Sequence, residues 1–265
     1  SRSTPTSLPK TPAIDPRMIR LRKIWVWASA TVLSGTVALA QGPPRFEVVN
    51  WTDKPLIRAD HPDAKGIPCG FEGGLVVKEG GAYHFFPTER IGKYCTEQTR
   101  IGHWRSTDGL TWNRVGTLYE STGDTTGRDP RAVFFAAMPV FDETANVWNI
   151  FYVSYRYTVR PKRGYTHSDG RIYRGVSKQK GRNGIGGPYR DVGVIMQPDS
   201  ESQAWEGHQG VDSFYPFKVG NHWYGFYGSA KTETLPERPC SFWAVGLAEA
   251  PSLAGPWKRL PATYN

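Results

Sequence analysis

The sequence repeats one pattern three times after residue 68, and this repeat restricts the possible folds more than any other feature. In each copy, an acidic residue close to Gly or Pro opens two aromatic-rich segments that a short turn joins. The acidic residues are Glu72, Asp129 and Asp212, which are 57 and 83 positions apart. Each copy therefore predicts a β-hairpin headed by a carboxylate.

A second hairpin follows the first in every copy and ends in Trp or Tyr. The first hairpins span 70–86, 128–155 and 210–228, and the second hairpins span 101–112, 172–189 and 242–257. Four short segments with alternating apolar positions and turn residues between them are typical of a propeller blade. The sequence therefore predicts an all-β fold, a β-propeller of four-stranded antiparallel blades with about three blades fully present.

The composition agrees with many short strands. The chain has 29 Gly and 21 Pro residues, and 13% of its residues are aromatic. No stretch after residue 40 keeps a helical period for long. Because propellers have at least four blades, we expect the domain at 41–265 to be incomplete at its C-terminus.

The N-terminal region predicts export. Residues 18–40 combine three basic residues, an apolar run and a small-x-small ending, Ala38-Leu39-Ala40, which together indicate a signal peptide. A retained membrane anchor is the alternative, but the apolar run is short and diluted by Ser, Thr and Gly. Residues 1–17 are interpreted as an extension outside the folded protein. We therefore expect a secreted or periplasmic protein with no membrane association after signal removal.

The charge does not indicate a nucleic-acid partner. The whole chain carries a formal charge of +9, but six of its 33 Lys and Arg residues and one of its 24 Asp and Glu residues precede Gln41. The remainder has 27 basic and 23 acidic residues, a net charge of +4. No basic stripe stands out in it, which argues against nucleic acid as a partner.

The three cysteines are Cys69, Cys95 and Cys240. Export permits a disulfide, and Cys69–Cys95 is the favoured pair because the two residues flank one hairpin-like segment. Cys240 would then be free. The cysteine spacing is not that of a zinc site, and no motif indicates a metal or an organic cofactor.

Three short motifs resemble those of the five-bladed β-propeller glycosidases, the group that includes glycoside hydrolase families 43 and 32. The first is Arg128-Asp129-Pro130, which is similar to the Arg-Asp-Pro motif of the second blade in those enzymes. Residues 106–112, with the sequence STDGLTW, resemble a hairpin common in their blades. Residues 248–257, with the sequence AEAPSLAGPW, resemble the end of a blade strand. The resemblance covers roughly 46–261 and implies hydrolysis of glycosidic bonds.

The resemblance also implies roles for the repeated acids. Glu72 takes the position of the base or nucleophile, and Asp129 that of a stabilising carboxylate. The general acid is open between Asp212, which stands at the repeat-equivalent place, and Glu206 in the preceding loop. The family usually carries Asp where this chain has Glu72 and Glu where it has Asp212.

Four further residues are candidates for contacts with the sugar. Arg128 could bind a carboxylate or an acidic sugar, and His208 could contact the sugar or transfer a proton. Trp104 and Trp205 lie beside polar loops and are candidate platforms for sugar stacking. The expected partner is a carbohydrate, and the sequence sets no oligomeric state.

Two other functions remain open. A carbohydrate-binding propeller without catalysis would explain the unusual Glu72. A sialidase-like propeller is suggested by residues 106–112, but that motif is one residue shorter than the sialidase hairpin and does not recur cleanly in the other copies.

Overall fold

The structure is a computed structural model that describes residues 47, 52–159, 166–231 and 242–261. The chain divides into two units, Ser1–Asn50 and Trp51–Asn265, and the strands among the described residues belong to the second. The predicted signal peptide at 18–40, the extension at 1–17 and Cys240 lie outside the described residues. Within the described part, no helix is both long and apolar enough to span a bilayer.

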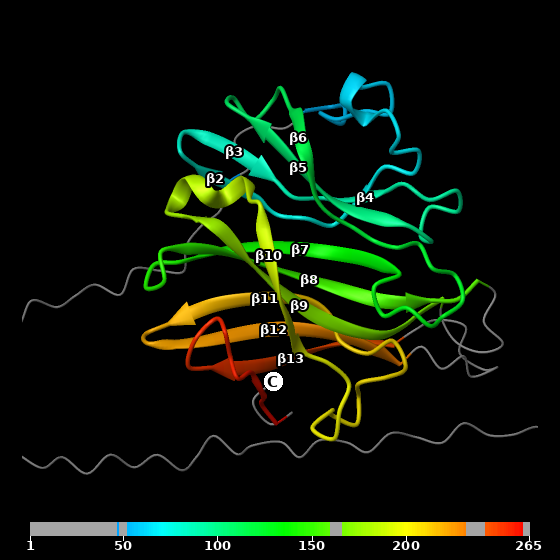
Figure 1. The fold of residues 1–265 in the computed structure, drawn as a ribbon, viewed down its shortest axis with the longest axis vertical. Coiled ribbons are helices and arrows are strands. Elements are labelled where there is room, and N and C mark those ends of the chain that lie inside the picture. The colour runs from blue at the N-terminus through cyan, green and yellow to red at the C-terminus, as the bar shows by residue number, and fades with distance from the viewer. Residues whose placement is uncertain (1–46, 48–51, 160–165, 232–241, 262–265) are drawn as a thin grey trace, which may run out of the picture. The chain divides into compact units, whose positions relative to one another are not determined.

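The strands form three antiparallel sheets, as the threefold repeat predicts (Figure 1). The four strands of blade 2 are β7 (Val133–Asp142), β8 (Val147–Tyr157), β9 (His167–Lys180) and β10 (Tyr189–Met196). The four strands of blade 3 are β11 (Asp212–Val219), β12 (His222–Lys231), β13 (Phe242–Ala250) and β14 (Lys258–Arg259). Two short 3-10 helices, η1 (Pro62–Ala64) and η2 (Arg182–Gly186), complete the described elements.

Blade 1 has six strands in four rows, because its first two rows are each broken in two. The strands are β1 (Phe71–Glu72), β2 (Val76–Glu79), β3 (Ala82–Phe85), β4 (Thr88–Arg90), β5 (Thr99–Ser106) and β6 (Asn113–Glu120). Strand β1 pairs with β4 and β2 pairs with β3, whereas β5 pairs with both β3 and β4 and also with β6. Thus β1 and β2 are successive parts of the first row, and blade 1 is also a four-row sheet.

Gly74 explains the break in the first row. Glycine adopts its φ of +107° readily, whereas other residues would be strained there. A Cβ at this position would also lie only 2.7 Å from the carbonyl oxygen of Phe86. The chain can therefore bend and pass close to the second row only with glycine at this position. The bend ends β1 at Glu72, the first acid of the repeat.

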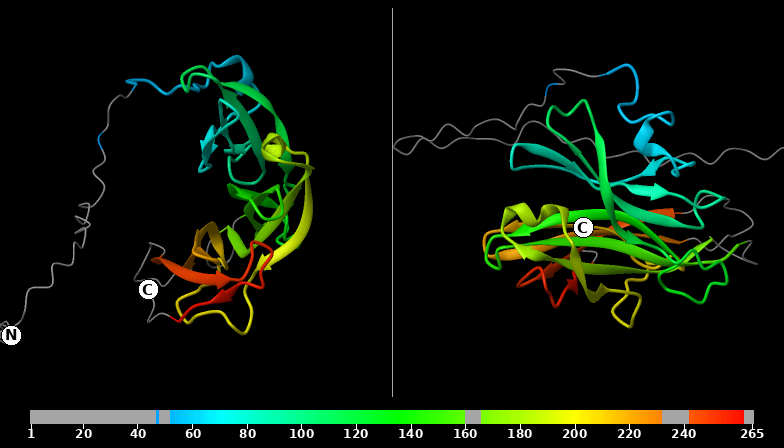
Figure 2. Two further views of the ribbon diagram at one scale, coloured as in Figure 1. Left: turned by 90° about the vertical axis from the view of Figure 1, so that its left-hand side faces the viewer. Right: turned by 45° about the horizontal axis from the view of Figure 1, so that its top comes forward.

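Blade 2 is apolar on both faces because it packs between the other two blades (Figure 1, Figure 2). Strand β8 is buried along nearly its whole length. Its alternate residues Ile150 and Tyr152 belong to a cluster with Phe86 of blade 1, whereas Phe151 belongs to a cluster with Phe214 of blade 3. The continuous apolar run in β8 is thus the sequence signal of a sheet covered on both sides.

The other face of blade 1 is covered by the segment before β1. Ile67 in this segment clusters with Trp104 and Trp112, and Ile57 and Ala64 pack against the same cluster. This face therefore has an apolar cover supplied by the chain itself.

A buried carboxylate joins three strands of blade 1. Glu89 on β4 is fully buried and accepts hydrogen bonds from the indole Nε1 of Trp104 at 2.8 Å and from Nε and Nη2 of Arg114 at 2.8 and 2.9 Å. The guanidinium of Arg100 also pairs with it. Because β4, β5 and β6 each contribute one or more of these side chains, the cluster locks the strand rows together.

Replacing Glu89 with Ala should therefore destabilise blade 1. The change leaves two largely buried guanidinium groups without their anion, a loss that typically costs about 3 kcal/mol or more. Equilibrium denaturation in urea measures it as a fall in the free energy of unfolding. The control is Glu143→Ala, which removes the exposed partner of Arg182 and should leave that free energy nearly unchanged. Equal effects of the two changes would contradict the structural role of Glu89.

Candidate active site

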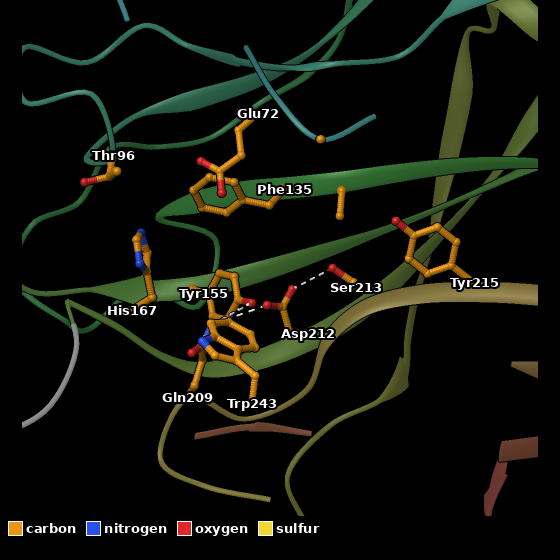
Figure 3. Close-up of a pocket in the computed structure, with 12 residues that line it drawn as sticks. Glu72, Thr96, Phe135, Tyr155, His167, Gln209, Asp212, Ser213, Tyr215 and Trp243 are labelled. Carbon is orange, nitrogen blue, oxygen red and sulfur yellow. Dashed lines mark hydrogen bonds between the residues drawn. The ribbon is translucent and has the colours of Figure 1, made fainter. Parts of the chain in front are cut away.

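All three blades contribute to one cavity of about 360 Å³ (Figure 3). This volume lies in the range of small-molecule sites. The lining residues are Glu72, Gly73, Thr96, Phe135, Ala136, Tyr155, His167, Gln209, Asp212, Ser213, Tyr215 and Trp243. Residues from widely separated parts of the chain meet here because the first strand of each blade lies beside the cavity.

Two of the repeated acids, Glu72 and Asp212, line this cavity. Glu72 is the last residue of β1, and Asp212 is the first residue of β11. Figure 3 shows the two side chains entering the cavity from opposite walls. The structure thus brings together two carboxylates that are far apart in the sequence.

The two carboxylates have different environments. The side chain of Glu72 is 52% exposed, and its Oε2 lies 3.4 Å from Nη1 of Arg90. Asp212 is more enclosed: Ser213 Oγ donates to its Oδ1 at 3.1 Å, and Gln209 Nε2 donates to its Oδ2 at 3.4 Å. Burial raises the pKa of Asp212, and hydrogen bonds from Tyr155 and Ser213 oppose that shift only in part. Asp212 therefore keeps a proton to a higher pH than an ordinary aspartate.

A close contact between blades 2 and 3 positions Asp212. The amide of Gly170 donates to the carbonyl oxygen of Gln209 at 2.7 Å, and the amide of Val211 donates to that of Gly170 at 2.9 Å. A Cβ on Gly170 would overlap the Val211 carbonyl oxygen and the ring of Tyr155. Only glycine permits this approach, which holds the start of β11 against β9 of blade 2.

His167 forms part of an aromatic wall of the cavity. Its ring centroid lies 5.3 Å from that of Phe135 and 5.5 Å from that of Tyr155. Burial lowers the pKa of His167 to about 4, so the imidazole is neutral at pH 7. Its Nε2 is buried and has no hydrogen-bond partner of ordinary geometry among the described residues.

The predicted disulfide Cys69–Cys95 is confirmed, with a Cα–Cα distance of 5.2 Å. Cys69 lies three residues before Glu72, and Cys95 precedes Thr96, which also lines the cavity. The disulfide therefore ties two parts of the cavity wall to each other.

Asp129, expected beside the other acids, is not among the residues that line the cavity. It lies in the loop before β7, where its Oδ1 accepts from the Arg131 amide at 2.8 Å and its Oδ2 accepts from the hydroxyl of Thr122. Arg128 is exposed in the same loop, and its carbonyl oxygen accepts from the Arg156 guanidinium. The hydrogen bonds of the Arg-Asp-Pro motif thus stabilise the loop that leads into β7, the first strand of blade 2.

Glu206 also lies outside the cavity lining. Its carboxylate is 3% exposed and pairs with Nε and Nη2 of Arg259 at 2.8 and 3.1 Å, and the Tyr227 hydroxyl donates to it at 3.0 Å. Both carboxylate oxygens are therefore engaged within blade 3.

The expected stacking platform at Trp104 requires correction. Trp104 is fully buried in blade 1 with its indole nitrogen bound to Glu89, so its ring cannot lie against a sugar. Trp205 stacks on Tyr227 at 5.5 Å and packs against the core, and His208 is an exposed loop residue. Neither of the last two lines the cavity.

Sequence reasoning missed several lining residues, including Tyr155, His167 and Gln209. Tyr155 continues the alternation that places Phe151 and Val153 on the face of β8 toward blade 3, which is a signal the sequence offers. His167 and Gln209 come from irregular connections whose paths no local pattern sets.

No family model matches this sequence, and no curated protein matches it. Solved structures do. Zg3597, a family 117 glycoside hydrolase from the marine bacterium Zobellia galactanivorans, superposes with a TM-score of 0.55 at 15% identity over 77% of this chain and 58% of that one. A complex of BT0996 with RGII gives a TM-score of 0.56 at 15% identity over 73% of this chain and 57% of that one. A third structure, described as a glycoside hydrolase, gives 0.56 at 14% identity with the same coverage.

These similarities show that the chain has the fold of the β-propeller glycoside hydrolases, in agreement with the sequence prediction. The chain spans a little under three fifths of the length of each of these structures.

The environment of Asp212 predicts a pH-dependent effect of Asp212→Asn on stability. Because the folded pKa is raised, the wild-type protein loses stability as the pH rises through that value, whereas Asn does not titrate. The variant should melt at a higher temperature than the wild type at pH 8, and the difference should shrink toward about pH 4, near the pKa of an unfolded aspartate. Thermal melts across this range measure the difference. Asp53→Asn, at an exposed position, is the control and should follow the wild type; parallel curves for Asp212→Asn as well would refute the assignment.

Proposed function

We propose that this protein is a glycoside hydrolase that cleaves glycosidic bonds of poly- or oligosaccharides in the three-blade cavity. The observation that carries the proposal is that Glu72 and Asp212, from blades 1 and 3, face the same cavity in different electrostatic environments. The fold shared with glycoside hydrolases supports it.

The chemistry needs one protonated and one ionised carboxyl group on opposite sides of the sugar. Asp212 suits the protonated role, since burial favours its neutral form, and it would donate a proton to the leaving oxygen. Glu72 suits the ionised role: it is open to solvent, and the guanidinium of Arg90 offsets its negative charge. It would act as the base toward water or as the nucleophile toward the sugar.

Between the two candidate acids, the contacts favour Asp212. Arg259 and Tyr227 donate hydrogen bonds to the Glu206 carboxylate, which lies outside the cavity lining, whereas Asp212 lines the cavity. Asp129 would support the site indirectly, by shaping the loop that leads into β7.

We propose that the protein works outside the cytoplasm. The signal-like segment at 18–40 supports export. The Cys69–Cys95 disulfide also supports it, because such bonds persist in oxidising compartments.

The second candidate function is sugar binding without catalysis. It is favoured by the position of Asp129, since only two of the three expected carboxylates line the cavity. Isothermal titration with oligosaccharides, combined with product analysis, separates the two functions: binding with no product from any of them would favour the second.

Glu72→Gln and Asp212→Asn should each lower kcat by at least about a hundredfold on a responsive substrate, because each removes one half of the acid–base pair. Reducing-sugar release from oligosaccharides of pentose, hexose and uronic acid units provides the measurement. Asp129→Asn, a matched change outside the cavity lining, should lower kcat less than about tenfold. The proposal fails if either cavity variant keeps wild-type turnover while folded.

A further inference from the structure

Two side chains that the proposed chemistry does not yet use contact Asp212 in the cavity wall. Tyr155 on β8 and Gln209 in the loop before β11 both line the cavity, and their exposed fractions are only 2% and 4%. Nε2 of Gln209 lies 3.3 Å from the hydroxyl oxygen of Tyr155 and 3.4 Å from Oδ2 of Asp212. Figure 3 shows the three side chains close together, across the cavity from Glu72. We call them the Asp212 network.

The available hydrogens set the direction of the hydrogen bonds in this network. The amide nitrogen of Gln209 carries two hydrogens, so it can donate one to Tyr155 and the other to Asp212. Burial raises the pKa of Tyr155 well above that of free tyrosine, so its hydroxyl keeps a hydrogen to donate to Asp212 in turn. The opposite amide orientation would set the Gln209 oxygen against an ionised Asp212, which electrostatic repulsion disfavours. Every hydrogen bond in the network therefore runs toward Asp212.

Tight packing fixes both donors. Tyr155 belongs to the apolar cluster between blades 2 and 3, and its ring centroid lies 6.0 Å from that of Phe135 and 5.5 Å from that of His167. Gln209 is held through its backbone, whose carbonyl oxygen accepts from the Gly170 amide. Because neither donor can easily change its rotamer, the Asp212 carboxyl has one preferred orientation in the cavity.

We propose that Tyr155 and Gln209 are positioning residues of the general acid: they hold the Asp212 carboxyl toward the sugar and set the pH at which it releases its proton. The proposal rests on the proposed hydrolase function, which makes Asp212 the acid. Neither residue makes or breaks a bond in the reaction, so each acts through Asp212.

The network opposes the effect of burial. Burial alone favours the neutral carboxyl, whereas an efficient general acid needs a pKa near the working pH so that it can also give up its proton. A hydrogen bond donated to Asp212, such as that from Tyr155, stabilises the ionised form and lowers the pKa again. The stabilising carboxylate expected at Asp129 lies outside the cavity lining, so in the described part of the chain neutral donors take its place beside the acid.

The other titratable groups around the network leave the alkaline range to Asp212. Glu72 on β1 stands across the cavity and pairs with Arg90, and His167 on β9 is neutral above its pKa of about 4. Asp169, also on β9, is paired with two arginines. A loss of activity toward high pH should therefore report the ionisation of Asp212.

The dependence of kcat/KM on pH tests the proposal in the full chain. Tyr155→Phe removes the hydroxyl, and Gln209→Met removes the amide while keeping a side chain of similar length. Each takes a donor away from the ionised Asp212, so the fall of kcat/KM at high pH should move upward by about one pH unit. A residue with only a structural role would lower activity at every pH without moving this fall.

Tyr227→Phe is the matched control. The Tyr227 hydroxyl donates to Glu206 at 3.0 Å, so this variant removes the same kind of donor from the other candidate acid. Its pH profile should match that of the wild type. A profile that moves with Tyr227→Phe and stays fixed with Tyr155→Phe would overturn the proposal and assign the acid to Glu206.

Nuclear magnetic resonance of carbon-labelled aspartate carboxyls measures the titration of Asp212 without any substrate, and the resonance lost in Asp212→Asn identifies it. The midpoint should rise by about one pH unit in Tyr155→Phe and in Gln209→Met, with circular dichroism establishing that both are folded. A midpoint unchanged in both folded variants would overturn the inference, whatever their activity. A midpoint that rises in a protein that hydrolyses no sugar would support the network and contradict the proposed function alone.

Discussion

The burial of apolar side chains between the faces of successive sheets is the interaction on which the rest of this structure depends. A single sheet cannot bury the apolar residues on its own faces, so they must pack against a neighbouring sheet. In β8, Ile150 packs toward blade 1 and Phe151 packs toward blade 3. This packing determines which sheets stack on one another. It also places the end of β1 and the start of β11 at one cavity, and without it the carboxylates of Glu72 and Asp212 would not meet there.

The two acidic residues that line the cavity come from the same repeated sequence pattern but have different electrostatic environments. Glu72 and Asp212 occupy comparable places in their blades, yet Glu72 stands at a bend open to solvent, whereas Asp212 lies behind the close contact of Gly170 with Gln209. Because removal from water penalises the charged form, the pKa of Asp212 rises. The difference between the two acids is therefore a property of their surroundings and not of their sequence motif.

Some parts of the site could be predicted and others could not. The pairing of Cys69 with Cys95 was predictable from the short segment between them. The burial of Trp104 was not, because its partner Glu89 comes from a neighbouring strand whose register no local pattern sets. Glu206 was misleading for the same reason: its partner Arg259 lies 53 residues away on β14.

The sequence by itself determined the number of sheets, their four-row construction and the acids that open them, since alternation and turn residues act over a few positions. Only the tertiary structure decided which acids meet. Glu72 and Asp212 line the cavity, whereas the Asp129 carboxylate accepts a hydrogen bond from the Arg131 amide in its own loop. The physical reason is that convergence depends on how whole sheets pack and where glycine allows close approach, and both are set by contacts between residues far apart in the chain.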